Sequence, residues 1–132
     1  MVGLVIYHKH LLVNAELDRP MQTEQEGIDF LTSLVKAIDM KILQGPFATY
    51  VTAEGNKGLT AIVLIETSHI AFHIWDEPAQ PVLQFDLYTC GLLHHQQILD
   101  LLQQTFEITS ADWVLFDREQ GFQIEDQGSI TP

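Results

Sequence analysis

Two neighbouring segments with alternating apolar and polar residues constrain the fold more than any other feature of the chain. In residues 69–75 one side of the alternation is Ile70, Phe72 and Ile74, and the other is His69, Ala71, His73 and Trp75. In residues 82–90 one side is Leu83, Phe85 and Leu87, and the other is Gln84, Asp86, Tyr88 and Cys90. Because the side chains of a strand point alternately to its two faces, both segments are predicted to be β-strands. Each strand offers one face to a core and carries reactive side chains on the other.

Two further segments have the residue spacing of amphipathic helices. Thr23 followed by Glu26 is a capping-box pattern, and the apolar residues that follow recur at helical spacing as far as Ile38. This pattern predicts a helix over residues 24–39. A second helix is predicted over residues 94–106, with its apolar residues on one stripe.

The remaining elements are predicted to be short strands and loops. The strands are expected at residues 10–15, 41–43, 47–52, 59–65 and 113–116. Gly45-Pro46 is expected to interrupt the second strand, the apolar run 59–65 is typical of a strand buried on both faces, and the tail after Gly121 is expected to be loose. The order β-α-β-β-β-β-α-β favours the α/β (α+β) class. We expect a two-layer α/β sandwich over residues 1–132, a single domain with a mostly antiparallel sheet and two helices on one face.

Charge and cysteine content limit the function classes open to this chain. Its 6 basic residues against 18 acidic ones give a formal net charge of −12, which disfavours nucleic acid and anionic membrane surfaces as partners. A cationic small molecule suits such a surface. The single cysteine forms no internal disulfide, and no apolar run approaches the roughly 20 residues of a membrane span. A cytoplasmic location is therefore expected.

Several polar residues invite other interpretations. Ser68, His73 and Asp86 are the residue types of a hydrolase triad, but the chain has no GxSxG elbow. The pairs His8-x-His10 and His94-His95 suggest metal ligands, yet no cysteine or HExxH motif accompanies them to complete a site. No metal is therefore expected, and the roles of these four histidines stay open.

The central motif is SHIAFHIW, from Ser68 to Trp75, followed by Glu77 and by Thr89-Cys90-Gly91. This combination resembles the prokaryotic S-adenosylmethionine decarboxylases. The resemblance extends outward to His10-Leu11-Leu12, to Gly58-Leu59-Thr60 and to the FDREQG segment at residues 116–121. It covers most of the chain.

This resemblance implies a self-processing enzyme that cleaves its own chain at Thr67-Ser68. Ser68 would become a pyruvoyl cofactor, whose ketone forms a Schiff base with the substrate amine and accepts electrons as CO₂ leaves. His73 would supply the base for the elimination, and Cys90 would return a proton to the substrate carbon. Thr60 stands where the family has a serine that assists processing. The product would be decarboxylated S-adenosylmethionine for polyamine (spermidine) synthesis.

The resemblance also implies a substrate pocket, and the chain departs from the family near it. Tyr50 and Trp75 would contact the adenine and the sulfonium, and Glu77 would hold the ribose hydroxyls. Thr67 stands where the family has a glutamate, with Glu66 one place earlier, and the loop before Gly58 is longer than is usual in the family. Two alternatives therefore stay open. One is a non-processing homologue with a binding or regulatory role, and the other is a pyruvoyl-dependent decarboxylase of another cationic amino acid.

The reactive strand faces also predict an assembly. They are too rich in histidine, tryptophan and tyrosine to be left open to water, while the helices are expected to cover only the opposite face. A homodimer in which the reactive faces meet is therefore expected, as the family resemblance also implies.

Overall fold

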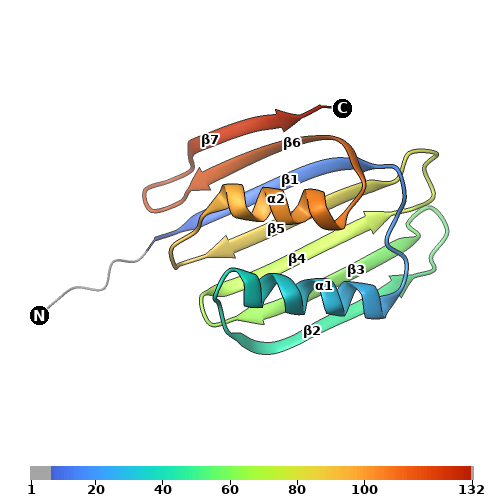
Figure 1. Ribbon diagram of the computed structural model, residues 1–132, viewed down its shortest axis with the longest axis horizontal. Coiled ribbons are helices and arrows are strands. Elements are labelled where there is room, and N and C mark those ends of the chain that lie inside the picture. The colour runs from blue at the N-terminus through green and yellow to red at the C-terminus, as the bar shows by residue number, and fades with distance from the viewer. Residues whose placement is uncertain (1–6, 132) are drawn as a thin grey trace, which may run out of the picture.

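The computed structural model describes residues 7–131, which form one seven-stranded antiparallel sheet with two helices packed on one face (Figure 1). The elements in chain order are β1 (Lys9–Leu17), α1 (Glu24–Ala37), β2 (Ile42–Val51), β3 (Gly58–Ile65), β4 (Ser68–Trp75), β5 (Val82–Thr89), α2 (His95–Thr105), β6 (Ile108–Asp117) and β7 (Gln123–Ile130). Across the sheet the strand order is β2-β3-β4-β5-β1-β6-β7. This arrangement confirms the expected α+β sandwich.

Both helices form where the sequence spacing places them. The Thr23 side chain accepts a hydrogen bond from the Glu26 backbone N–H, and the Glu26 carboxylate accepts one from the Thr23 N–H, so the capping box at the start of α1 is complete. The helix α2 begins after His94, whose side chain makes no capping hydrogen bond. Neither helix within residues 7–131 is long and apolar enough to cross a membrane.

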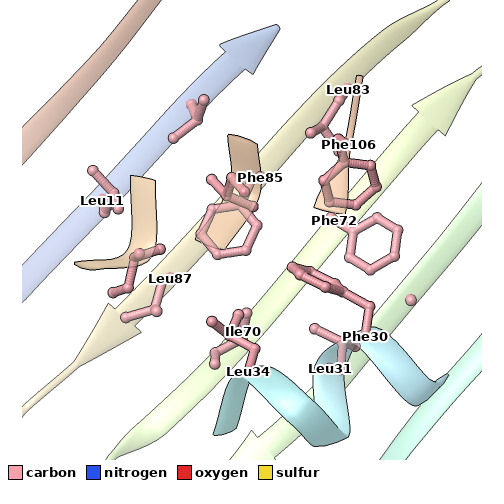
Figure 2. Close-up of a cluster of buried hydrophobic side chains, with 14 of the residues drawn as sticks. Leu11, Phe30, Leu31, Leu34, Ile70, Phe72, Leu83, Phe85, Leu87 and Phe106 are labelled. Atoms are coloured by element: carbon pink, nitrogen blue, oxygen red, sulfur yellow. The ribbon is translucent and has the colours of Figure 1, made fainter. Parts of the chain in front are cut away.

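The core lies between the helices and one face of the sheet (Figure 2). Three aromatic rings meet at its centre: Phe30 of α1 and Phe106, just after α2, pack edge-on against Phe72 of β4, with ring centroids 5.7 and 5.8 Å away. The residues on the apolar side of β4 and β5 are buried, as the alternation predicts. The other face of these strands lies on the uncovered side of the sheet, which we call the open face.

Two sequence predictions about strands were wrong. Residues 59–65 are buried on one face only, because Ile62 and Leu64 of β3 lie on the open face and are each 39% exposed. The strand β2 continues through Gly45-Pro46, where irregular register accommodates the turn residues instead of ending the strand. The sequence also alternates loosely over residues 3–17, and the part of this segment before Tyr7 lies outside the described residues.

The largest error concerns the tail, which is not loose but forms the edge strand β7. Eight residues, Gln123–Ile130, pair antiparallel with β6. Polar residues hold this strand in place: Ser129 donates a hydrogen bond to Asp112, and His95 of α2 contacts Asp126 at 2.8 Å. Gly128 lies opposite Trp113, and a Cβ at this position would stand 2.7 Å from the indole ring. The strand is thus held by pairing and not by burial, which the sequence pattern does not reveal.

Candidate active site

The Thr67-Ser68 peptide bond lies in the tight turn between β3 and β4, at the end of the sheet where β5 also ends. Ser68 pairs with Ile65 on one side and with Thr89 on the other. The backbone N–H of Cys90 donates a hydrogen bond of 2.8 Å to the carbonyl oxygen of Thr67. This contact draws electron density away from the Thr67 carbonyl carbon, the atom that the Ser68 hydroxyl would attack.

Ser68 has a strained backbone. Its φ angle is 142°, a left-handed value that residues with a Cβ rarely adopt, and such strain costs of order 1–3 kcal/mol. Cleavage after Thr67 would release this strain, because the new terminus is no longer held in the turn.

The end of β5 is held by Thr89, a buried residue of the central motif to which the sequence assigned no role. Thr89 is 0% exposed, and its hydroxyl oxygen accepts a 3.0 Å hydrogen bond from the Gly91 N–H. This bond joins residues 89 and 91 and fixes a tight turn with Cys90 at its centre. A Cβ at Gly91 would stand 3.2 Å from the Thr67 side chain, so the turn leaves little room there.

Thr60 and His73 form a second group, farther along the same strands. They are cross-strand partners in β3 and β4, and the Thr60 hydroxyl lies 3.1 Å from Nδ1 of His73. The ring of Trp75 lies beside that of His73, with centroids 5.8 Å apart. A trough of about 610 Å³ on the open face runs from His73 past Gln84 and Asn14 to Asp112.

Ser68 and His73 do not meet within one chain. Five residues of strand separate them, which corresponds to about 16 Å. Asp86 contacts neither of them, because its carboxylate faces His10 and His69. The residues of a Ser68-His73-Asp86 hydrolase triad are therefore not assembled.

Of the three residues expected to bind substrate, Trp75 and Glu77 line one cavity and Tyr50 does not. Trp75 is on the open face, where its indole N–H donates a 2.8 Å hydrogen bond to the Asn56 side chain. The carboxylate of Glu77 accepts hydrogen bonds from the Gly55 and Lys57 backbone N–H groups, so it fastens the loop before β3. A cavity of about 450 Å³ lies beside these residues, lined by Gly55, Trp75, Glu77, Pro78, Val82 and Gln84.

Tyr50 is not part of this cavity. It pairs with Leu59, which is buried under the helices, so Tyr50 projects from the face opposite to Trp75. Its backbone N–H donates to Glu24 of α1, and its hydroxyl donates a 2.6 Å hydrogen bond to Asp76. This bond to Asp76 raises the pKa of the Tyr50 hydroxyl.

A cluster on the open face joins His10, His69 and Asp86, which come from β1, β4 and β5. Nε2 of His10 is hydrogen-bonded to one oxygen of Asp86, and Nε2 of His69 lies 3.5 Å from the other. Arg118 donates a 3.1 Å hydrogen bond to Nδ1 of His10. Because a guanidinium only donates, Nδ1 of His10 accepts, and the ring's proton is on Nε2, facing Asp86.

This tautomer distinguishes a metal site from a hydrogen-bonded network. The three donor atoms lie within 4.8 Å of one another, a spacing that suits a metal ion. A metal-bound histidine, however, normally donates its second ring N–H, whereas His10 accepts from a cation at that nitrogen. The geometry therefore fits a hydrogen-bonded network better than a metal site. Burial raises the pKa of Asp86, but its hydrogen bonds with His10 and His69 outweigh burial and hold that pKa below its ordinary value.

The three remaining histidines are His8, His94 and His95. His8 Nδ1 lies 3.0 Å from the Tyr88 hydroxyl, on the open face beside the cluster. His94 precedes α2 without a capping contact. The Asp126 carboxylate has a lowered pKa, first because of its hydrogen bond with His95 and then because it accepts the Gln127 N–H.

Residues 9–119 match a family described as S-adenosylmethionine decarboxylase. Among curated relatives, the S-adenosylmethionine decarboxylase proenzyme of Picrophilus torridus is 32% identical over 75 residues, which is 56% of this chain and 55% of that protein. The aligned region thus spans about half the length of this relative.

Proposed function

Because the chain belongs to the S-adenosylmethionine decarboxylase family, we propose that it is a self-cleaving, pyruvoyl-dependent decarboxylase of S-adenosylmethionine that serves polyamine synthesis. The observation that carries this proposal is the hydrogen bond from the Cys90 N–H to the Thr67 carbonyl at the strained Ser68. It puts the polarised carbonyl, the serine and the cysteine at one turn. The proposal does not depend on a glutamate before the serine.

The residues at this turn fit the formation of a pyruvoyl group. The Ser68 hydroxyl oxygen attacks the Thr67 carbonyl carbon, the bond to the Ser68 nitrogen breaks, and that nitrogen takes the hydroxyl proton, which leaves an ester. Loss of the Ser68 Cα proton then expels the Thr67 carboxylate, and water replaces the nitrogen, which departs as ammonia. The Cys90 N–H stabilises the negative charge on the Thr67 oxygen in the first step. Once formed, the group supplies an electron-accepting ketone for an amine substrate.

Cys90 and Thr60 complete the assignment of roles. Cys90 follows directly after β5 and is half-buried on the open face, in position to give a proton to the substrate carbon after CO₂ leaves. The Thr60 hydroxyl holds the His73 ring through Nδ1, which leaves the other ring nitrogen for proton transfer.

The separation of His73 from Ser68 supports a homodimer. A base about 16 Å away along the strand cannot serve the same chain's Ser68. The open face also carries exposed apolar side chains, among them Phe47 at 56% and Ile62 at 39% exposure, which a second copy would cover. We therefore propose that two open faces meet and that each copy supplies His73 to the other copy's Ser68.

Mass spectrometry of the purified protein tests cleavage. We expect two fragments, residues 1–67 and 68–132, with the second blocked to amino-terminal sequencing. Ser68→Ala should leave one intact chain, while Ser33→Ala, an exposed serine of α1, should cleave as the parent does. An intact parent chain after long incubation refutes the proposal in favour of a binding protein.

Release of CO₂ from carboxyl-labelled S-adenosylmethionine tests the substrate. A cleaved protein that releases no CO₂ from this compound, but does so from another cationic amino acid, keeps the chemistry and refutes the substrate. Mixing the Ser68→Ala and His73→Asn chains tests the dimer. We expect the His73→Asn chain to cleave only in the mixture, and cleavage of that chain alone contradicts the shared site.

A further inference from the structure

Arg118 is a guanidinium without a carboxylate partner in a strongly acidic chain. The protein has 18 acidic residues and only 6 lysines and arginines. Lys9 pairs with Asp117 and Glu125, and Arg19 pairs with Glu107. Within residues 7–131 no such ion pair includes Arg118, although it is half-buried. Lys36, Lys41 and Lys57 also appear in no ion pair among the described residues, but these three lysines are exposed, whereas Arg118 is half-buried. A half-buried guanidinium without a carboxylate, in a chain with three times as many acidic as basic side chains, requires an explanation.

The neighbours of Arg118 hold its guanidinium in place without neutralising it. The guanidinium carbon lies 4.8 Å from the Tyr88 ring centroid and 5.0 Å from that of Phe122. One nitrogen donates to Nδ1 of His10. Asp86, the acidic group of this cluster, contacts His10 and His69, and no ion pair joins it to Arg118 among the described residues. The remaining N–H donors of the guanidinium are thus oriented but unused by any described carboxylate.

Backbone pairing puts Arg118 at the same end of the open face as Cys90. The Arg118 N–H donates to the His8 carbonyl, and the Tyr7 N–H donates to the Cys90 carbonyl, so the ends of β6, β1 and β5 lie in one row. Two strand spacings separate Arg118 from Cys90, which is about 10 Å between Cα atoms. The Arg118 side chain spans part of this distance, because it lies over Tyr88, two residues from Cys90 on β5.

We infer that Arg118 binds the carboxylate of an amino-acid ligand beside Cys90 on the open face, at the end of the sheet where the Thr67-Ser68 turn lies. A planar guanidinium held against two aromatic rings can present paired N–H groups to a carboxylate, which is the geometry of a bidentate ion pair. The inference rests on the proposed function for the identity of that ligand, because a decarboxylase must orient the group that leaves as CO₂. The carboxylate contact itself does not depend on chain cleavage.

Binding to uncleaved protein separates this inference from the proposed function. In the Ser68→Ala background, calorimetry compares S-adenosylmethionine with decarboxylated S-adenosylmethionine, which is the same cation without the carboxylate. Arg118→Gln should weaken binding of the carboxylated ligand by about tenfold or more and leave the decarboxylated ligand unchanged, since charge-assisted hydrogen bonds are lost for only one of them. Arg118→Lys should recover part of the loss, because a lysine keeps the charge without the fork.

Arg19→Gln is the matched control, since Arg19 is exposed and already paired with Glu107. It should change the affinity of neither ligand. Equal weakening of both ligands by Arg118→Gln overturns the inference, because it indicates a structural role, and so does the absence of any change. A Ser68→Ala parent that binds neither ligand overturns it as well. None of these outcomes depends on whether the wild-type chain cleaves, which mass spectrometry decides independently.

Discussion

Replacement of Thr89 by valine removes the hydroxyl that holds the end of β5 and so measures its contribution to stability. Valine has nearly the shape of threonine, so the change opens no cavity of note, but the Gly91 N–H loses its 3.0 Å acceptor. Thr89 is 0% exposed, and Gly91 is half-buried. A buried donor without a partner costs about 1–3 kcal/mol, and the partial exposure of Gly91 puts the expected loss near 1–2 kcal/mol.

Urea unfolding of Thr89→Val in the Ser68→Ala background measures this loss on a single uncleaved chain. A destabilisation of 1–2 kcal/mol should lower the Tm by roughly 3–10 °C in a domain of this size. Thr89→Ser is the matched control, because serine restores the acceptor and removes only a methyl group.

The same substitution should slow chain cleavage when Ser68 is present. The Gly91 bond fixes the turn that aims the Cys90 N–H at the Thr67 carbonyl, so a looser turn weakens stabilisation of the developing oxyanion. Thr89→Ser should cleave nearly as fast as the parent. Parent-like stability and parent-like cleavage of Thr89→Val would refute this account of the turn.

Two further changes test the open face. The pKa of Asp86 is lower in the folded protein than in the unfolded chain, so the unfolded chain binds more protons as pH falls below about 4. The ionised Asp86 therefore stabilises the fold above that range, and this stabilisation is lost as pH falls through the folded pKa. Urea midpoints between pH 3 and 6 should fall less steeply for Asp86→Asn than for the parent, and an unchanged slope contradicts this. Cys90→Ala should keep the fold but suppress CO₂ release, whereas a cysteine that only packs would cost about 1 kcal/mol of stability with turnover retained.

The central strands were predictable because their alternation is a local property. Every second residue of β4 and β5 is apolar, and burial against two helices leaves only one register in which these residues face the core. The strand β7 could not be found this way. Its sequence is polar because it lies at the edge of the sheet, and its stability comes from pairing with β6 and from contacts such as that between His95 and Asp126.

The sequence identified the face that carries the site but not the contacts made on it. Alternation puts His69 and Asp86 on one face of their strands, whereas the neighbours of each residue depend on the register between strands far apart in the chain. Pairing of β1 with both β5 and β6 brings His10 to Asp86 and Arg118 to His10. Because β1 is separated by more than 60 residues from the nearer of these strands, no local pattern reports that register.

The same dependence on register explains why Tyr50 and Trp75 were expected together and are found apart. Both were predicted to contact the same substrate, because the family resemblance puts both in one pocket. The pairing of Tyr50 with the buried Leu59 fixes its side chain on the helix face, while Trp75 follows the buried Ile74 and therefore faces the other way. The aromatic surface offered to a ligand on the open face thus comes from Trp75, and any second aromatic wall there must come from another strand or from a second copy of the chain.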